Sequence, residues 1–135
     1  MLLENIKSPK DVKALSIEQL PTLAKEIRDG ILNRDSNIGG HVGPNLGIVE
    51  TTIAMHYVFN CPEDKFVFDV SHQSYPHKML TGRAFGYYDN NRFQEISGYS
   101  SPAESPEYDQ FELGHTSTSI SLATGLQKAR DIKGT

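Results

Sequence analysis

Three histidines occupy positions from which imidazoles could meet at one site. His41 follows a glycine pair in GGHVGPNLG, His72 follows an apolar run in DVSHQSYPHK, and His115 precedes the hydroxyl residues of GHTSTS. An imidazole with an ordinary pKa near ~6.5 both donates and accepts protons around neutral pH. The free N–H groups of a helix start attract anions, phosphates above all. The three segments therefore predict a cleft that binds a phosphorylated ligand.

Each segment also has a plain structural interpretation, which the residues alone leave open. A lone histidine at a loop–helix junction is commonly a surface or capping residue, and hydroxyl clusters at helix starts are common caps. A zinc site from Asp69, His72 and His77 matches no standard ligand set, and Pro76 keeps the two imidazoles off one helical face. We therefore assign no metal ligand within the chain.

Three other reactive side chains receive structural roles. His56 lies among apolar residues and is expected to be a core histidine with satisfied hydrogen bonds. Cys61 has no nearby histidine to activate its thiol, which makes it a structural residue. Glu50 falls in the first turns of a predicted helix, where a carboxylate complements the helix dipole.

Hydrophobic spacing predicts three helices around these residues. In the first helix Ser16 and Gln19 form a capping box, and the glycines at 39 and 40 end the segment. Its buried stripe recurs every three or four residues, at Leu20, Leu23, Ile27 and Ile31. A second helix is expected over about 46–59, and a third after the hydroxyl residues 116–118.

One strand is predicted, over about residues 66–70. Its side chains are apolar on both faces, as in a strand buried within a parallel sheet. A lone strand flanked by helices is the start of an α/β sheet. We therefore expect a helix-rich α/β fold of which this chain is the front part. The stretch 84–113 has no regular pattern, and loops of that length are usually functional or mobile.

Composition argues against several classes of partner. The formal net charge is −4, and the 13 basic residues form no stripe for nucleic acid. No apolar run approaches the ~20 residues that span a bilayer, and the N-terminus lacks a secretory signal pattern. The single cysteine fits a reducing compartment. We expect a cytoplasmic protein that binds neither nucleic acid nor a membrane.

Taken together, the segments closely resemble the amino-terminal domain of the 1-deoxy-D-xylulose-5-phosphate synthase family. The motifs GGHVGPNLG, DVSHQSYPHKMLTGR and ELGHTSTSIS follow one another in the family's order, from about residue 2 to the end. Transketolases share the first glycine–histidine loop but carry another motif in place of DVSHQSYPHK. The resemblance implies that residues 1–135 are part of a thiamine-diphosphate-binding fold, on the diphosphate side, with the remaining sheet and later domains absent.

The resemblance also implies the chemistry. The family condenses pyruvate, with decarboxylation, and D-glyceraldehyde 3-phosphate to 1-deoxy-D-xylulose 5-phosphate, for isoprenoid and thiamine biosynthesis. It uses thiamine diphosphate and a divalent metal, usually Mg²⁺, and the intact family member is expected to be a homodimer. The cofactor carries the difficult chemistry, and the protein orients it and moves protons.

By position, the resemblance assigns roles to individual residues. His41 and His72 are the catalytic histidines, and His77 and Lys78 order the loop that carries His72. Cofactor contacts are assigned to His72, Gly114, His115, Thr116 and Ser117. The metal ligands are expected beyond residue 135, so the isolated chain is predicted to have no synthase activity.

The chain departs from the family pattern in three places. Ser71 replaces a glycine before His72, Gln94 and Glu95 replace a glycine pair, and SSPAESPE replaces a more basic stretch. Basic side chains in that stretch would contact an anionic acceptor, so acceptor specificity is open. Two alternatives remain beside the synthase: a transketolase-like paralogue with another acceptor, and a non-catalytic split subunit that needs a partner chain.

Overall fold

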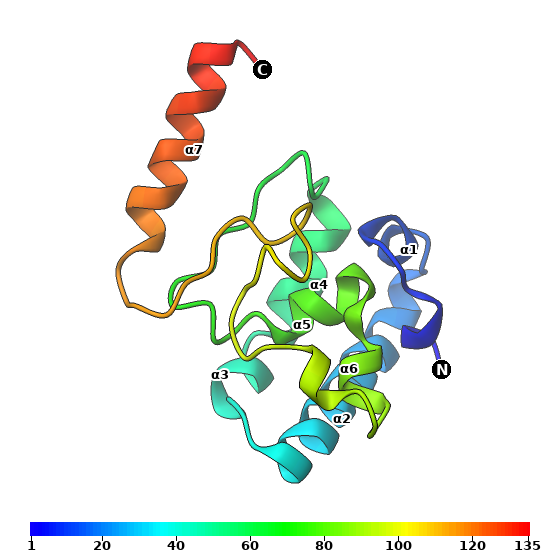
Figure 1. The fold of residues 1–135 in the computed structure, drawn as a ribbon. Helices are drawn as coiled ribbons and strands as arrows, with labels where there is room; N and C mark the ends of the chain where they lie inside the picture. Colours follow the sequence, from blue (N-terminus) through cyan, green and yellow to red (C-terminus); the bar gives the residue numbers. More distant parts are fainter.

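The computed structural model describes residues 1–135 as helices joined by irregular segments, with no strand (Figure 1). In chain order the elements are η1 (Leu3–Asn5), α1 (Pro9–Lys13), η2 (Ile17–Gln19), α2 (Leu20–Ile38), α3 (Gly43–Leu46), α4 (Val49–Val58), α5 (Tyr75–Lys78), η3 (Met79–Arg83), α6 (Phe85–Tyr88), η4 (Phe93–Glu95) and α7 (Ser119–Lys133). None of these helices has the length and apolar character needed to cross a membrane.

The central helix α2 forms as its sequence predicts. Ser16 and Gln19 make the expected capping box just ahead of it, and Gly39 follows its last residue. Three residues of its apolar stripe, at positions 23, 27 and 31, are fully buried. They belong to a core of 15 buried residues, to which η1, α1, α4, α5, η3 and α6 also contribute. Burial of this apolar surface is the main stabilising contribution to the fold.

The helix predicted over about 46–59 forms as α4 (Val49–Val58), and a separate short helix, α3 (Gly43–Leu46), precedes it. α3 ends at Leu46, and α4 begins at Val49 after a short turn at Gly47. α4 turns Val49, Ile53 and His56 toward the core, at the spacing of one helical face.

The predicted central strand over 66–70 is wrong, and so is the α/β class. Residues 66–68 have no regular structure, and their backbone groups make no hydrogen bond. Phe66 and Phe68 are nevertheless buried in a small cluster with Cys61, so the apolar pattern predicted burial correctly. A strand requires a neighbouring strand as its hydrogen-bonding partner, and these 135 residues supply none.

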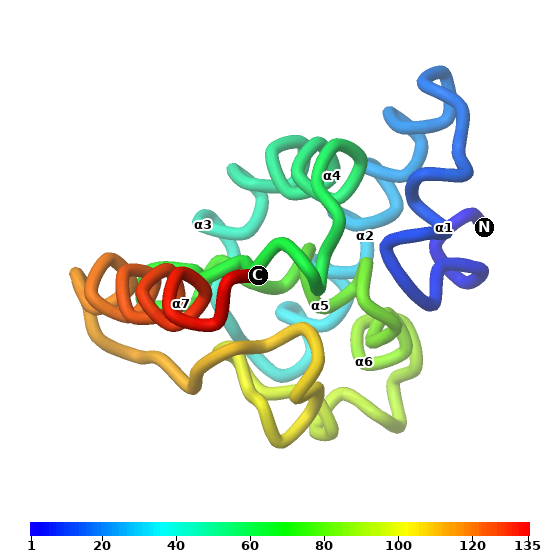
Figure 2. Tube along the Cα trace, turned by 90° about the horizontal axis from the view of Figure 1, so that it is seen from above, coloured from blue at the N-terminus to red at the C-terminus, as the bar shows by residue number.

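The stretch 84–113 is irregular as predicted, apart from the short elements α6 and η4. It is also firmly packed against the core, because Tyr87, Phe93 and Ile96 are buried. Figure 2 shows the irregular part of this stretch curving around the helices on its way to α7. The segment is therefore a covering strap over α2 and α5 rather than a free loop.

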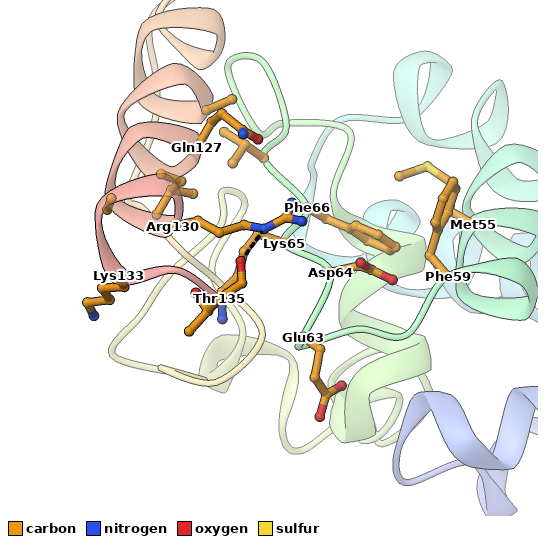
Figure 3. A pocket seen from close by; sticks show the side chains of 14 residues that line it. Met55, Phe59, Glu63, Asp64, Lys65, Phe66, Gln127, Arg130, Lys133 and Thr135 are labelled. Atoms are coloured by element: carbon orange, nitrogen blue, oxygen red, sulfur yellow. Dashed lines mark hydrogen bonds between the residues drawn. The ribbon is translucent and has the colours of Figure 1, made fainter.

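The last helix, α7, has none of this packing. None of its residues is buried, and Ile120 and Ile132 are 75% and 76% exposed. In Figures 1 and 2 it lies apart from α1, α2 and α6. A cavity of about 800 Å³ separates it from α4 and from the segment 63–67. Figure 3 shows Gln127 and Arg130 of α7 on one side of this space and Met55 and Phe66 on the other.

Candidate functional site

His41 and His72 lie next to each other on the surface of the helical core. Their ring centroids are 5.4 Å apart in an edge-to-face arrangement, and both residues are half-buried. His41 lies in the loop between α2 and α3. His72 follows Val70 and Ser71, whose φ angles of 59° and 69° turn the backbone out of the irregular segment toward α5. The structure thus brings together the two histidines that the resemblance assigns to catalysis.

One buried amide holds the two histidine loops together. Asn45 Nδ2 donates to the carbonyl oxygens of His41, at 2.6 Å, and His72, at 2.8 Å. Asn45 Oδ1 accepts from the backbone N–H of Tyr75 at 3.0 Å. Asn45 is 0% exposed, and both ends of its amide are engaged. Because these hydrogen bonds fix the backbone at His41 and at His72, the two histidine loops are held in a fixed position relative to each other.

A buried polar wall from α2 and α5 stands behind His41. The hydroxyl of Tyr75 lies 3.3 Å from the backbone nitrogen of His41 and 3.3 Å from its Nδ1. A side chain at Gly40 would come within 2.4 Å of Asp35 Oδ1 and 3.1 Å of the Tyr75 hydroxyl, so only glycine fits there. Burial raises the pKa of the Asp35 carboxyl, although the charges of Arg34 and His41 oppose this.

Tyr99 forms the other wall of the site. Its ring centroid lies 5.3 Å from that of His41, again edge to face. The turn that carries it is fixed from below, since Lys78 Nζ donates to the Ser97 carbonyl at 2.8 Å. Tyr99 was not among the site residues predicted from the sequence. The only signal was its place in the long irregular stretch, where functional residues are common.

His115 does not join the other two histidines. It is exposed, and so are Gly114, Thr116 and Ser117, which were assigned to the cofactor. The start of α7 is occupied from within the chain: Asp69 accepts hydrogen bonds from the backbone N–H groups of Ser117 at 3.1 Å and Ser119 at 3.3 Å. Hydrogen bonds from Ser117 and Ser119 lower the pKa of Asp69, against a small opposing effect of desolvation. These donors already hold a carboxylate.

A second histidine pair is fully buried. His56 Nε2 and His77 Nδ1 are 2.9 Å apart, and their rings stack at 15°. His77 Nε2 lies 3.3 Å from Asp109 Oδ1 and 3.1 Å from the Tyr108 carbonyl. Burial, helped by the charge of His77, lowers the pKa of His56 to about 3. His56 is therefore a neutral core histidine as predicted, but its hydrogen bonds are not all satisfied, because its Nδ1 is buried without a partner.

Asp109 connects this pair to two buried cations. Arg83 donates to both carboxylate oxygens of Asp109, at 2.7 and 2.8 Å, and to Glu104 at 3.2 Å. Lys78 Nζ donates to Glu104 at 2.9 Å. Burial alone would raise the pKa of Asp109, but hydrogen bonds from Arg83 and His77 hold it well below its usual range.

This ionic cluster was not predicted, although the sequence contains a signal for it. The motif YPHKMLTGR carries three basic residues, yet it forms a segment in which Lys78 is 0% exposed. Buried cations require carboxylate partners. Glu104 and Asp109 are acidic residues of the irregular stretch, and they supply those partners. His77 and Lys78 were predicted to order the loop that carries His72, but their side-chain bonds run instead to His56 and to the stretch 97–109.

Two further structural assignments can be checked directly. Cys61 is buried, and desolvation raises the pKa of its thiol to about 11, which agrees with a structural role. Glu50 lies in the first turn of α4 as predicted, but its carboxylate accepts two hydrogen bonds from Arg28 of α2, each at 2.6 Å. The role of Glu50 is thus more specific than a contact with the helix dipole, because it forms an ion pair that connects α4 to α2.

The residues near His41 and His72 fit an uncharged polar part of a ligand better than an anionic one. Two imidazoles and two tyrosines face this region, and His72 Nδ1 is a buried polar atom with no protein partner. No group of three or more His, Cys, Asp or Glu side chains is arranged to hold a metal ion. The donors at the start of α7 are satisfied by Asp69.

Half-buried imidazoles on loops fixed to a rigid core can take part in hydrogen bonding and proton transfer. The family model described as 1-deoxy-D-xylulose-5-phosphate synthase matches residues 3–135. The chain therefore belongs to the 1-deoxy-D-xylulose-5-phosphate synthase family, as its amino-terminal domain.

Curated relatives with this name are similar along almost the whole chain. The proteins from Dictyoglomus thermophilum, Corynebacterium diphtheriae and Chlamydia pneumoniae are 56%, 55% and 52% identical to it. The matches cover 99%, 98% and 98% of the chain, but only 22%, 21% and 20% of the respective relatives. The chain thus spans about a fifth of the length of the curated relatives that it matches.

Proposed function

We propose that this chain provides the histidine-bearing part of a synthase that condenses pyruvate, with decarboxylation, and D-glyceraldehyde 3-phosphate to 1-deoxy-D-xylulose 5-phosphate. The observation that carries the proposal is the pairing of His41 with His72 at 5.4 Å within a chain that matches the family over residues 3–135. The proposal includes a cytoplasmic, homodimeric enzyme that supplies isoprenoid and thiamine precursors. Cell fractionation and light scattering would test those two properties.

His41 and His72 are the proposed catalytic residues. Thiamine diphosphate, when bound, supplies the electron sink for decarboxylation and for carbon–carbon bond formation. The two imidazoles would donate hydrogen bonds to oxygens that gain negative charge, and would move protons to and from them. The Asn45 amide holds both histidine backbones in place, so these groups need little reorganisation during the reaction.

The proposed cofactor contacts divide into two groups. His72 fits the polar, uncharged part of thiamine diphosphate, because its buried Nδ1 has no protein partner. Gly114, His115, Thr116 and Ser117 are exposed and border Asp69, whose carboxylate would repel a diphosphate. We therefore propose that this segment contacts the cofactor away from its phosphates. Mg²⁺ would be bound by residues outside this chain.

A hybrid enzyme tests the proposal. The chain replaces the matching region of the Dictyoglomus thermophilum relative, which is 56% identical over 134 residues. We expect the hybrid to form 1-deoxy-D-xylulose 5-phosphate, and His41→Asn or His72→Asn to lower kcat by about 100-fold or more. Asn91→Ala, at an exposed residue that has no proposed role in the site, is the control for a surface substitution. A folded hybrid that is inactive with every acceptor would contradict the proposal.

The chain alone gives a complementary test. We expect no release of carbon dioxide from pyruvate when thiamine diphosphate and Mg²⁺ are added, because the metal ligands are proposed to lie elsewhere. A measurable rate of decarboxylation by the purified chain would overturn this part of the proposal.

One observation favours a transketolase-like paralogue with another acceptor as a second candidate. The stretch 100–107 contains no basic side chain, and its Glu104 is already engaged by Lys78 and Arg83. Nothing in this stretch would attract the phosphate of an acceptor. Assays of the hybrid with several phosphorylated and unphosphorylated aldehydes decide between the two candidates, since a preference for an unphosphorylated acceptor would favour the second.

A further inference from the structure

The Tyr75 hydroxyl has an unusual position with respect to His41. It lies 3.3 Å from the backbone nitrogen and 3.3 Å from Nδ1 of the same residue. Tyr75 is 0% exposed, so its hydroxyl cannot exchange these partners for bulk water. Its ring is fixed by Tyr87, with ring centroids 5.6 Å apart, and by the Arg34 guanidinium at 5.3 Å. The hydroxyl is thus held rigidly against one face of the candidate site.

The proton arrangement follows from the donor and acceptor count. The backbone N–H of His41 can only donate, so the Tyr75 oxygen accepts from it. The Tyr75 hydroxyl then has its own proton to donate, and His41 Nδ1 is the one acceptor within hydrogen-bonding distance. If Nδ1 carried a proton instead, the hydroxyl proton of Tyr75 would be buried without an acceptor, which is unfavourable.

We infer that Tyr75 is a positioning residue that fixes the tautomer of His41. It donates to Nδ1, so the proton of the neutral imidazole stays on Nε2. His41 therefore presents an N–H donor, rather than a basic nitrogen, on the side of the ring that Tyr75 does not cover. Asp35 lies close to this pair, and its Oδ2 is buried without a partner, so it adds negative potential without removing the Tyr75 proton.

The catalytic consequence rests on the proposed function. With Nε2 protonated, His41 stabilises an oxygen that becomes negative in the transition state, and it does not abstract a proton while neutral. Proton removal would then fall to His72, whose Nδ1 is free of protein partners. His41 would thus act as the hydrogen-bond donor and His72 as the proton acceptor, and the Tyr75 hydroxyl would be the cause of this difference.

Nuclear magnetic resonance of the ¹⁵N-histidine-labelled chain tests the tautomer without any need for activity. At a pH about two units above the ordinary histidine pKa, we expect His41 to carry its proton on Nε2. In Tyr75→Phe the Nδ1 resonance should move toward that of a nitrogen without a hydrogen bond. The matched control is Tyr87→Phe, because this hydroxyl is also buried but has no partner.

Each outcome decides the inference. A wild-type His41 with its proton on Nδ1 would overturn it, and this measurement does not depend on any variant folding. An Nδ1 resonance that is unchanged in folded Tyr75→Phe would also overturn it. In the hybrid enzyme, Tyr75→Phe should lower kcat with little change in KM, whereas Tyr87→Phe should not. If the hybrid were inactive but His41 had the expected tautomer, the proposed function would be contradicted, whereas the inferred role of Tyr75 would still be supported.

Discussion

At the scale of single residues, Asn45 has more influence on the site than either histidine's own side-chain contacts. Its amide bridges two loops that are distant in sequence. It donates to the carbonyl oxygens of His41 and His72 and accepts from the backbone N–H of Tyr75. An asparagine in a glycine-rich loop gives no indication of this from sequence alone. Only the folded chain shows that its side chain points inward, where its exposure is 0%.

We predict that Asn45→Ala destabilises the chain by about 2–3 kcal/mol, because buried partners lose their hydrogen bonds. The edge-to-face contact between His41 and His72 should also be lost. Chemical denaturation measures the first effect, and the ring chemical shifts of both histidines report the second. Asn91→Ala, an exposed asparagine whose side chain makes no hydrogen bond, should change stability by less than about 0.5 kcal/mol. Similar losses in both variants would refute the bridging role.

The buried His56 predicts a dependence of stability on pH. Its folded-state pKa is about 3, well below its ordinary value of 6.5. Between about pH 6.5 and pH 3, His56 is therefore protonated in the unfolded chain but not in the folded chain. The free energy of unfolding accordingly falls as pH decreases through that range. From about pH 7 to about pH 5 the expected contribution of this one group is a loss of about 2 kcal/mol.

Denaturation of the wild type and of His56→Phe at a series of pH values measures this contribution. The variant should lose less stability than the wild type over the same range, whatever its absolute stability. His115→Gln removes an exposed histidine and serves as the control for a change in histidine number. Parallel pH profiles for the wild type and His56→Phe would show that His56 is not the responsible group.

At the scale of elements, the irregular strap is ordered by charge as well as by apolar packing. Lys78 and Arg83 extend from α5 and η3, and they reach carboxylates at 104 and 109 in the strap. The backbone N–H of Ser101 also donates to Asp109, at 2.8 Å. Because the same strap carries Tyr99, these buried ion pairs determine where an aromatic wall of the histidine site lies.

We predict that Asp109→Asn destabilises the chain by about 3 kcal/mol, since it leaves buried positive charge without its carboxylate. Backbone amides of residues 97–111 should exchange with solvent faster than in the wild type, because the strap is released first. Hydrogen exchange read by mass spectrometry measures this. Glu107→Gln, an exposed carboxylate of the same strap, should leave both properties close to wild type. If amide exchange of residues 97–111 were unchanged in Asp109→Asn, the ion pairs of Asp109 would not be what holds the strap in place.

Sequence patterns predicted those parts of the structure that depend on local rules. The capping box at Ser16 and the buried stripe of α2 follow from spacing along one helix, and both are confirmed. The strand at 66–70 failed because strand formation depends on a partner, which no local pattern can reveal. The ionic cluster around Asp109 joins residues far apart in the chain, and a single sequence does not show which charges meet.

The residues of the candidate site also divide into those that local sequence patterns predicted and those that they did not. Motif order indicated His41 and His72, which the fold places together, and it also indicated His115, which the fold leaves exposed. The supporting residues Asn45, Tyr75 and Tyr99 were not identified, because their importance lies in the direction of their side chains. Their roles as bridge and walls emerge only from tertiary geometry.

At the scale of the whole molecule, α7 contrasts with the rest of the chain. Apart from a bond from the Thr118 hydroxyl to the neighbouring His115 carbonyl, the hydrogen bonds that connect residues 117–135 to the remainder of the chain all end on Asp69. Single helices of this length are marginally stable in water without tertiary packing, and α7 buries no side chain. Its order therefore depends on the Asp69 contact far more than α2 depends on its own cap.

We predict that Asp69→Ala lowers the helical content measured by circular dichroism and accelerates amide exchange throughout 119–133. The denaturation midpoint of the core, followed by tyrosine fluorescence, should stay close to wild type. Glu112→Ala removes an exposed carboxylate near α7 and is the control. Loss of protection in α2 together with α7 would show instead that the chain unfolds as one cooperative unit.

The exposure of α7 has a consequence for limited digestion. The last buried residue of the chain is Asp109, and the stretch 114–117 is accessible from solvent. An endopeptidase that cuts there would leave every interior side chain on a single fragment. Brief treatment should accordingly yield a resistant body with both paired imidazoles and a short-lived peptide that carries the final helix.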